Sequence, residues 1–182
     1  MNQDFSPLHL DVKAFAQAAS TRSGHNLLSN LERLMQETHG LGADRLLDWS
    51  ARGEIRCDPV GAEQVWLHVT VAASVSLTCQ RCLGPVDITV LENHSYRFVG
   101  SEEEAQAQDE EAEEDVLALS RDFNLAELIE DEVLLALPLI AFHEKCPVEV
   151  KLSVVDPGFD ATATEKPNPF AVLAKLQGEK SK

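Results

Sequence analysis

The sequence has few of the features that mark several large protein classes. No apolar stretch reaches the about 18 residues that a membrane-spanning helix needs, and the first residues lack the basic-then-apolar pattern of a secretory signal. No Gly-rich phosphate loop or nucleophile-elbow motif is present, and aromatic residues make up only 5% of the chain. We therefore expect a cytoplasmic protein, and the motifs do not support an enzyme.

Positive charge is also scarce. The 182 residues include 15 basic and 31 acidic ones, which gives a formal net charge of −16 with no run of three basic residues. Nucleic-acid binding depends largely on contacts from Lys and Arg to phosphate, so the charge favours a basic protein partner over naked RNA. The alternative is direct RNA binding through a sheet face and the C-terminal lysines. These are Lys166, Lys175, Lys180 and Lys182.

The acidic residues are concentrated in one segment. Residues 102–115 contain nine acidic residues and no basic one. A segment of this composition has little apolar surface to bury, and it is usually solvated and mobile. The sequence therefore predicts a disordered acidic insertion at 101–115 within a single domain spanning residues 1–182. The tail, residues 178–182, is expected to fray.

Alternating apolar and polar residues predict a long central hairpin. Apolar side chains recur at every second position from Val65 to Cys79, which is typical of a half-buried strand. At about 3.3 Å per residue this strand would be roughly 50 Å long, so a bend or bulge is expected near Ala72-Ala73. The alternation resumes at Pro85 after a Gly-Pro turn signal. Upstream, a smaller hairpin that turns at Gly53 is predicted.

Three helices are predicted, over residues 26–38, 124–138 and 168–177. The second begins with Asn124 as a capping residue and has Glu127 three residues later, a variant of the capping box. The third begins with Asn-Pro and ends before a glycine. The order of helix, strands and helices predicts an α+β fold. In it, an antiparallel sheet with a long central hairpin, which could close into a barrel, is packed by three helices.

The tip of the predicted hairpin contains the sequence Cys79-Gln80-Arg81-Cys82. A C-x-x-C pair at a hairpin tip is half of a zinc-ribbon site, and His143 and Cys146 offer a second pair of ligands with the same spacing. The pattern alone favours four free thiols over zinc, because a second pair led by histidine is less diagnostic than a second C-x-x-C. A redox dithiol is disfavoured, because such a motif normally begins a helix.

Four stretches of the sequence form a recognisable series. They are LTCQRCLGPV, LAELIEDEVLLALPLI, HEKC and KPNPFAVLAKL. In this order they resemble the YceD family of bacterial large ribosomal RNA subunit accumulation proteins, and Glu132 and Pro138 are among the matched residues. The resemblance implies a cytoplasmic, non-enzymatic factor needed for the synthesis, processing or stability of large-subunit ribosomal RNA. It implies no catalytic residues.

The charge and the resemblance together favour an acidic adaptor that binds a basic ribosomal or assembly protein, with large-subunit ribosomal RNA contacted directly or indirectly. The acidic segment would increase the association rate, and the hairpin tip would supply specificity. No cofactor is firmly implied, and structural zinc remains an option. The candidate partner-binding residues are Arg81, Leu83, Pro85, Asn168 and Phe170.

Overall fold

The structure is a computed structural model that describes residues 5–149 and residue 154. The chain divides into two units, Met1–Val148 and Glu149–Lys182, and the description below concerns the first. The predicted helix at 168–177, with Asn168 and Phe170, lies outside the described residues, and so does the tail, residues 178–182. The single domain spanning residues 1–182 stays a prediction.

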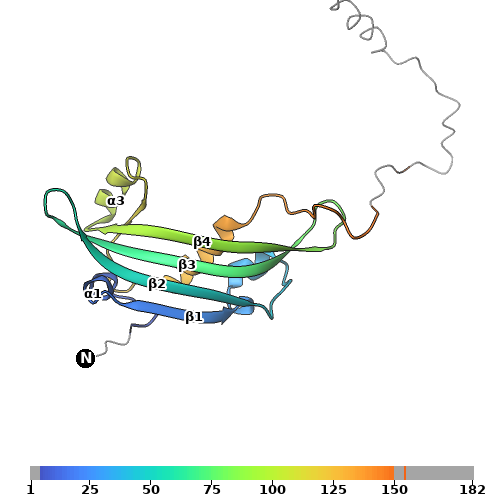
Figure 1. Cartoon of the computed structure of the whole chain (residues 1–182), viewed down its shortest axis with the longest axis horizontal. Coiled ribbons are helices and arrows are strands. Elements are labelled where there is room, and N and C mark those ends of the chain that lie inside the picture. The colour runs from blue at the N-terminus through green and yellow to red at the C-terminus, as the bar shows by residue number, and fades with distance from the viewer. Residues whose placement is uncertain (1–4, 150–153, 155–182) are drawn as a thin grey trace, which may run out of the picture. The chain divides into compact units, whose positions relative to one another are not determined.

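The first unit is built on one five-stranded sheet with the strand order β1-β2-β3-β4-β5 (Figure 1). The strands are β1 Thr21–Leu27, β2 Leu46–Cys57, β3 Glu63–Thr78, β4 Pro85–Val99 and β5 Asp115–Ala118. Strands β1 to β4 pair antiparallel, whereas β5 runs parallel to β4. The α+β prediction is confirmed. In the described part of the chain the sheet stays open at β1 and β5 and does not close into a barrel.

The long central hairpin is confirmed as β3 and β4. Their pairing runs without interruption from Val65 opposite Phe98 to Thr78 opposite Pro85, so the bulge predicted near Ala72-Ala73 is absent. Both strands are instead gently curved along their whole length (Figure 1), as expected of a twisted sheet.

The smaller hairpin predicted to turn at Gly53 is wrong. Strand β2 passes straight through this residue, which pairs with Leu67 in the middle of the sheet. Its lack of a side chain serves packing, because a Cβ atom there would lie 2.7 Å from the Cα atom of Ala16 in helix α1 (Val12–Gln17). Gly53 thus allows the helix backbone to approach the strand closely. The turn between β2 and β3 comes later, where the N–H of Asp58 donates to the carbonyl of Ala62 over 2.9 Å.

Four α-helices complete the described unit: α1 Val12–Gln17, α2 Glu32–Glu37, α3 Glu102–Asp109 and α4 Leu125–Ala136. Helix α4 crosses behind the strands in the view of Figure 1, and its Ile129 and Val133 are buried in the main core. The prediction for α4 is confirmed, including its cap: Asn124 Oδ1 accepts from the N–H of Glu127 over 3.3 Å. The helix predicted over 26–38 is broken into the end of β1, a 3-10 turn and α2. Among the described residues, no helix is long and apolar enough to cross a membrane.

The acidic segment, for which the sequence predicts disorder, is helical over α3. Ser101 caps this helix by accepting from the N–H of Glu104 over 3.2 Å. The first turn contains three glutamates, whose charge is favourable at the positive end of the helix dipole. Ala105 is buried in a small second core with Val99 and Val116. Capping and this contact therefore order a segment whose composition alone predicts no structure.

Candidate metal centre

The tip of the β3–β4 hairpin is a tight turn. The N–H of Cys79 donates to the carbonyl of Gly84 over 2.8 Å, and the N–H of Leu83 donates back to the carbonyl of Cys79 over 2.8 Å. Leu83 has φ 60°, a left-handed conformation that is uncommon for a residue with a side chain. The turn leaves Leu83 75% exposed while Cys79 is fully buried.

The chain that follows α4 returns to this tip. The N–H of Gln80 donates to the carbonyl of Ala141 over 2.8 Å. Two residues later, the N–H of His143 lies 3.5 Å from the Sγ atom of Cys79, and His143 Nδ1 lies 3.5 Å from Cys82 Sγ. These contacts join residues that are more than sixty positions apart, with separations of 61 and 64.

The four residues predicted as ligands are brought together. The potential ligand atoms of Cys79, Cys82, His143 and Cys146 all lie within 4.8 Å of one another. Three thiolates and one imidazole are a common donor set for structural zinc, and the ligand atoms of such a tetrahedral site are about 3.5–4 Å apart. A small contraction would close the site, so this Cys₃His cluster fits a zinc ion.

The backbone around the cluster favours a thiolate at Cys79. Burial is the largest single effect and would raise the pKa of this thiol, but the backbone N–H groups of Cys82, His143 and Arg81 point at its sulfur, and together they lower its pKa to about 5. Burial and the neighbouring sulfur atoms of Cys82 and Cys79 raise the pKa of Cys146. One sulfur is thus prepared to ligate at neutral pH, while Cys146 would lose its proton on metal binding.

The exposed residues of the tip form its outer surface. Arg81, Leu83 and Pro85, the candidate partner-binding residues of the tip, are all exposed, and their binding role stays a prediction. The guanidinium of Arg81 lies 5.5 Å from the centre of the Phe142 ring. Sequence reasoning missed the apolar character of the loop after α4, where Leu139, Ile140 and Phe142 are also exposed.

Two carboxylates of α4, those of Glu130 and Glu132, are buried. Glu132 is 4% exposed and accepts a hydrogen bond from the hydroxyl of Tyr96. Burial, followed by this hydrogen bond, raises the pKa of Tyr96. The other oxygen of Glu132 lies 3.2 Å from His94 Nδ1, and His94 Nε2 lies 3.3 Å from Asp115. The family-matched Glu132 therefore links α4, β4 and β5.

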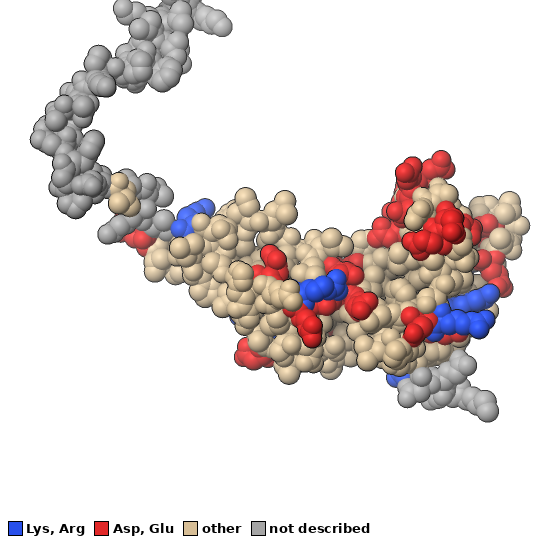
Figure 2. Space-filling model, turned by 180° about the vertical axis from the view of Figure 1, so that it is seen from behind, with Lys and Arg blue, Asp and Glu red and all other residues tan. Residues whose placement is uncertain are grey.

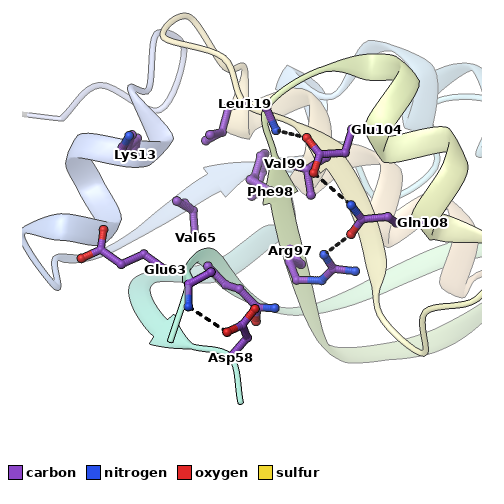
Figure 3. A pocket seen from close by; sticks show the side chains of 13 residues that line it. Lys13, Asp58, Glu63, Val65, Arg97, Phe98, Val99, Glu104, Gln108 and Leu119 are labelled. Carbon is purple, nitrogen blue, oxygen red and sulfur yellow. Dashed lines mark hydrogen bonds between the residues drawn. The ribbon is translucent and has the colours of Figure 1, made fainter. Parts of the chain in front are cut away.

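A polar cavity of about 320 Å³ lies at the other end of the hairpin, where Val65 pairs with Phe98 (Figure 3). Its polar side chains largely bond to one another: Gln108 accepts from Arg97 over 2.6 Å and donates to Glu104 over 3.0 Å. Glu104 also accepts from the N–H of Gly100 over 3.1 Å. These bonds attach α3 to β4, so the polar network of the cavity has a structural role.

The helix side of the sheet is acidic. Figure 2 shows this side, and carboxylates gather most densely over α3. The first turn of α3 contains Glu102, Glu103 and Glu104, with no basic residue in its last turn. Exposed acidic groups of this density produce a local negative potential that attracts cationic partners.

Fold and site together define a class: an α+β protein with an open sheet, a Cys₃His cluster at the tip of its central hairpin, and an acidic helix side. The chain belongs to the YceD family, since the family model described as "Large ribosomal RNA subunit accumulation protein YceD" matches residues 67–177. A curated relative of that name from Haemophilus influenzae is 31% identical over 173 residues, which cover 94% of this chain and 95% of the relative. No solved structure matches the chain.

Proposed function

We propose that this chain is a cytoplasmic, non-enzymatic factor for the accumulation of large-subunit ribosomal RNA, and that it acts as an acidic adaptor for a basic ribosomal or assembly protein. The name of its relative from Haemophilus influenzae states the ribosomal RNA role. The observation that carries the adaptor mechanism is a net charge of −16 in a family named for an RNA. Because phosphates are repelled by such a surface, a basic protein is the better matched direct partner.

In this proposal the acidic surface of α3 and the partly apolar surface of the hairpin tip have different tasks. The acidic residues of α3 attract the partner over distance and raise the association rate. The hairpin tip, with Arg81, Leu83 and Pro85, makes the short-range contacts that select it. Exposed apolar residues beside an arginine support this task, since such residues are enriched at protein interfaces.

We also propose that the Cys₃His cluster holds a structural zinc ion. The ion would fix the loop after α4 to the hairpin tip. Among the described residues, the two are joined by the backbone bond between Gln80 and Ala141, by weak contacts to sulfur and by the stacking of Arg81 on Phe142. Support comes from the donor set and from the mutual distances of at most 4.8 Å.

Metal analysis of the full chain, purified without chelator, tests the zinc proposal. One zinc per chain is expected, and Cys82→Ser should lose it. The matched control is Cys57→Ser, because Cys57 is an exposed free thiol outside the cluster and its loss should leave the zinc content unchanged. A metal-free wild-type chain, or equal zinc in both variants, would contradict the site.

Capture of partners from cell lysate by the tagged chain, with and without ribonuclease, tests the adaptor function. A basic large-subunit or assembly protein should remain bound after the RNA has been destroyed. If recovery collapses with ribonuclease, the contact runs through RNA, and the argument from charge is wrong.

A further inference from the structure

A second concave surface lies on the helix side, away from the hairpin tip. It is a cavity of about 550 Å³ between the N-terminal segment, β1, β2, the 3-10 turn that precedes α2, and α4, here named the α4 pocket. Its apolar wall includes Trp49, Leu31 and Ile129, and Glu127 and Glu130 of α4 also line it. A cavity of this size, with an apolar wall and a few polar groups, is typical of a binding site.

The apolar wall of the α4 pocket is rigidly built around Trp49, which is 8% exposed. The indole lies against the backbone of β1, where a Cβ atom on Gly24 would be 2.8 Å from Trp49 Cζ2. The indole N–H donates to Asn26 Oδ1 over 3.3 Å. Packing and this hydrogen bond hold the ring in one orientation, so the pocket exists before any ligand binds.

The two carboxylates of the α4 pocket differ in their availability. Glu130 is occupied: its Oε1 accepts from the N–H groups of Arg33 and Leu34 over 2.8 and 3.0 Å. Its Oε2 pairs with the guanidinium of Arg33 over 3.2 Å. The exposed carboxylate of Glu127, by contrast, makes no hydrogen bond or ion pair with the described residues. Glu127 is therefore the negative group that a ligand can reach.

We propose that the α4 pocket binds an arginine side chain of the basic partner, an inference that rests on the proposed adaptor function. The aliphatic stem and planar guanidinium of arginine can pack along Trp49 and Leu31 while the charge pairs with Glu127. Arginine suits this combination better than lysine, because its guanidinium both stacks on aromatic rings and pairs with carboxylates in a fixed geometry. The negatively charged carboxylates of the pocket would repel a nucleic-acid phosphate.

The two tryptophans of the chain provide a site-resolved test. Trp49 lines the α4 pocket, whereas Trp66 is covered by the guanidinium of Arg56, which lies 4.6 Å from the ring centre. The ¹⁵N-labelled full chain is titrated with the peptide acetyl-Gly-Leu-Arg-Leu-Gly-amide. A matched peptide contains citrulline, which has nearly the shape of arginine without its charge. The indole N–H signal of Trp49 should shift saturably with the arginine peptide, and that of Trp66 should stay in place.

Charge variants complete the test. Glu127→Gln should weaken binding of the arginine peptide by roughly three- to fivefold, which is the effect of one partly exposed ion pair. It should hardly change the affinity for the citrulline peptide. The matched control Glu110→Gln removes the same charge at the end of α3, outside the pocket, and should leave both affinities unchanged. Equal binding of the two peptides, equal shifts of the two indoles or equal effects of the two variants would each overturn the proposal.

Failure of the α4 pocket and failure of the adaptor function are distinguishable. If the peptide test fails but a basic protein is still captured after ribonuclease treatment, the partner binds elsewhere on the chain, and only the pocket proposal falls. If the captured protein is lost with ribonuclease, the adaptor function is wrong whatever the peptide result, and the pocket then has no basic partner to serve.

Discussion

Replacing Glu130 by alanine should be among the most damaging single substitutions on the helix side. Helix α2 has no capping side chain of its own, and Glu130 of α4 takes that part by accepting from two backbone N–H groups in its first turn. Glu130 is 8% exposed. In the alanine variant both N–H groups would lose their acceptor at a site that water reaches poorly.

The size of the effect follows from these contacts. Leaving a buried N–H group without a partner costs about 1–3 kcal/mol, and the upper part of the range applies where the lost acceptor was charged. The ion pair with Arg33 adds less than about 1 kcal/mol, because exposed pairs contribute little, and the Arg33 side chain is 46% exposed. The N–H of Leu34 is buried and that of Arg33 is only part-buried, so the two lost bonds cost about 2–3 and about 1–2 kcal/mol. Together with the ion pair, we expect Glu130→Ala to lower the free energy of unfolding by about 3–6 kcal/mol in total. At about 2–4 °C per kcal/mol, the midpoint of thermal unfolding should fall by about 6–24 °C.

Urea and thermal unfolding followed by circular dichroism test this expectation. Glu130→Gln retains one acceptor oxygen and should lose about half as much stability as the alanine variant. The control is Glu127→Ala in the same helix, an exposed position where the change should stay within about 0.5 kcal/mol. If Glu130→Ala and Glu127→Ala differ by less than about 0.5 kcal/mol, the capping argument is refuted.

Three further predictions concern the sheet and α3. Gly53→Ala should destabilise the fold by about 1–3 kcal/mol through a clash with α1. Gly84→Ala should be nearly neutral, because its Cβ would approach nothing closer than 3.7 Å; similar unfolding midpoints for the two would contradict the close approach. Hydrogen bonds from Arg56, then from His68, lower the pKa of Glu54 from 4.5 to about 2, so its stabilisation is complete above about pH 4.5 and is lost as the pH falls towards 2. The stability deficit of Glu54→Gln in urea should therefore be larger at pH 7 than at pH 3, and a constant deficit would exclude this linkage. Neutralising four exposed carboxylates of the α3 region should slow association with the captured partner at least about threefold at low salt and reduce its salt dependence, whereas unchanged kinetics in surface-bound assays would remove this role. The substitutions are Glu102→Gln, Glu103→Gln, Glu110→Gln and Glu111→Gln, which spare the bonded Glu104.

Much of the fold follows from local patterns in the sequence. The period-two alternation from Val65 onwards reports the burial of one sheet face, and β3 and β4 follow it. Helix α4 has a cap, an apolar stripe and a stop signal within fifteen residues, so local information determines it. The spacing in the sequence identifies Cys79, Cys82, His143 and Cys146 as candidate ligands and no more, and only the return of the chain after α4 places His143 and Cys146 beside the hairpin tip.

What the sequence failed to predict depends on tertiary contacts. Glycine is typical of turns, yet Gly53 lies within β2 and allows α1 to approach closely. No local pattern in the sequence indicates this contact. The acidic composition of α3 predicts disorder, although a serine caps the helix and one of its alanines is buried. The hydrogen bonds of Glu130 and Glu132 have no local signal in the sequence, because their partners lie on α2 and β4, far away in the chain. Strand β5 pairs parallel with β4. This pairing depends on how α3, which connects the two strands in the sequence, packs against them.

The most direct test of the adaptor function uses RNA-free components. Proteins extracted from purified large ribosomal subunits and freed of RNA are passed over the immobilised chain, and ribosomal RNA alone is passed over a second column. We predict that a basic protein is retained in near-equal stoichiometry and eluted by salt, while the RNA flows through. Retention of the RNA without any protein would contradict it.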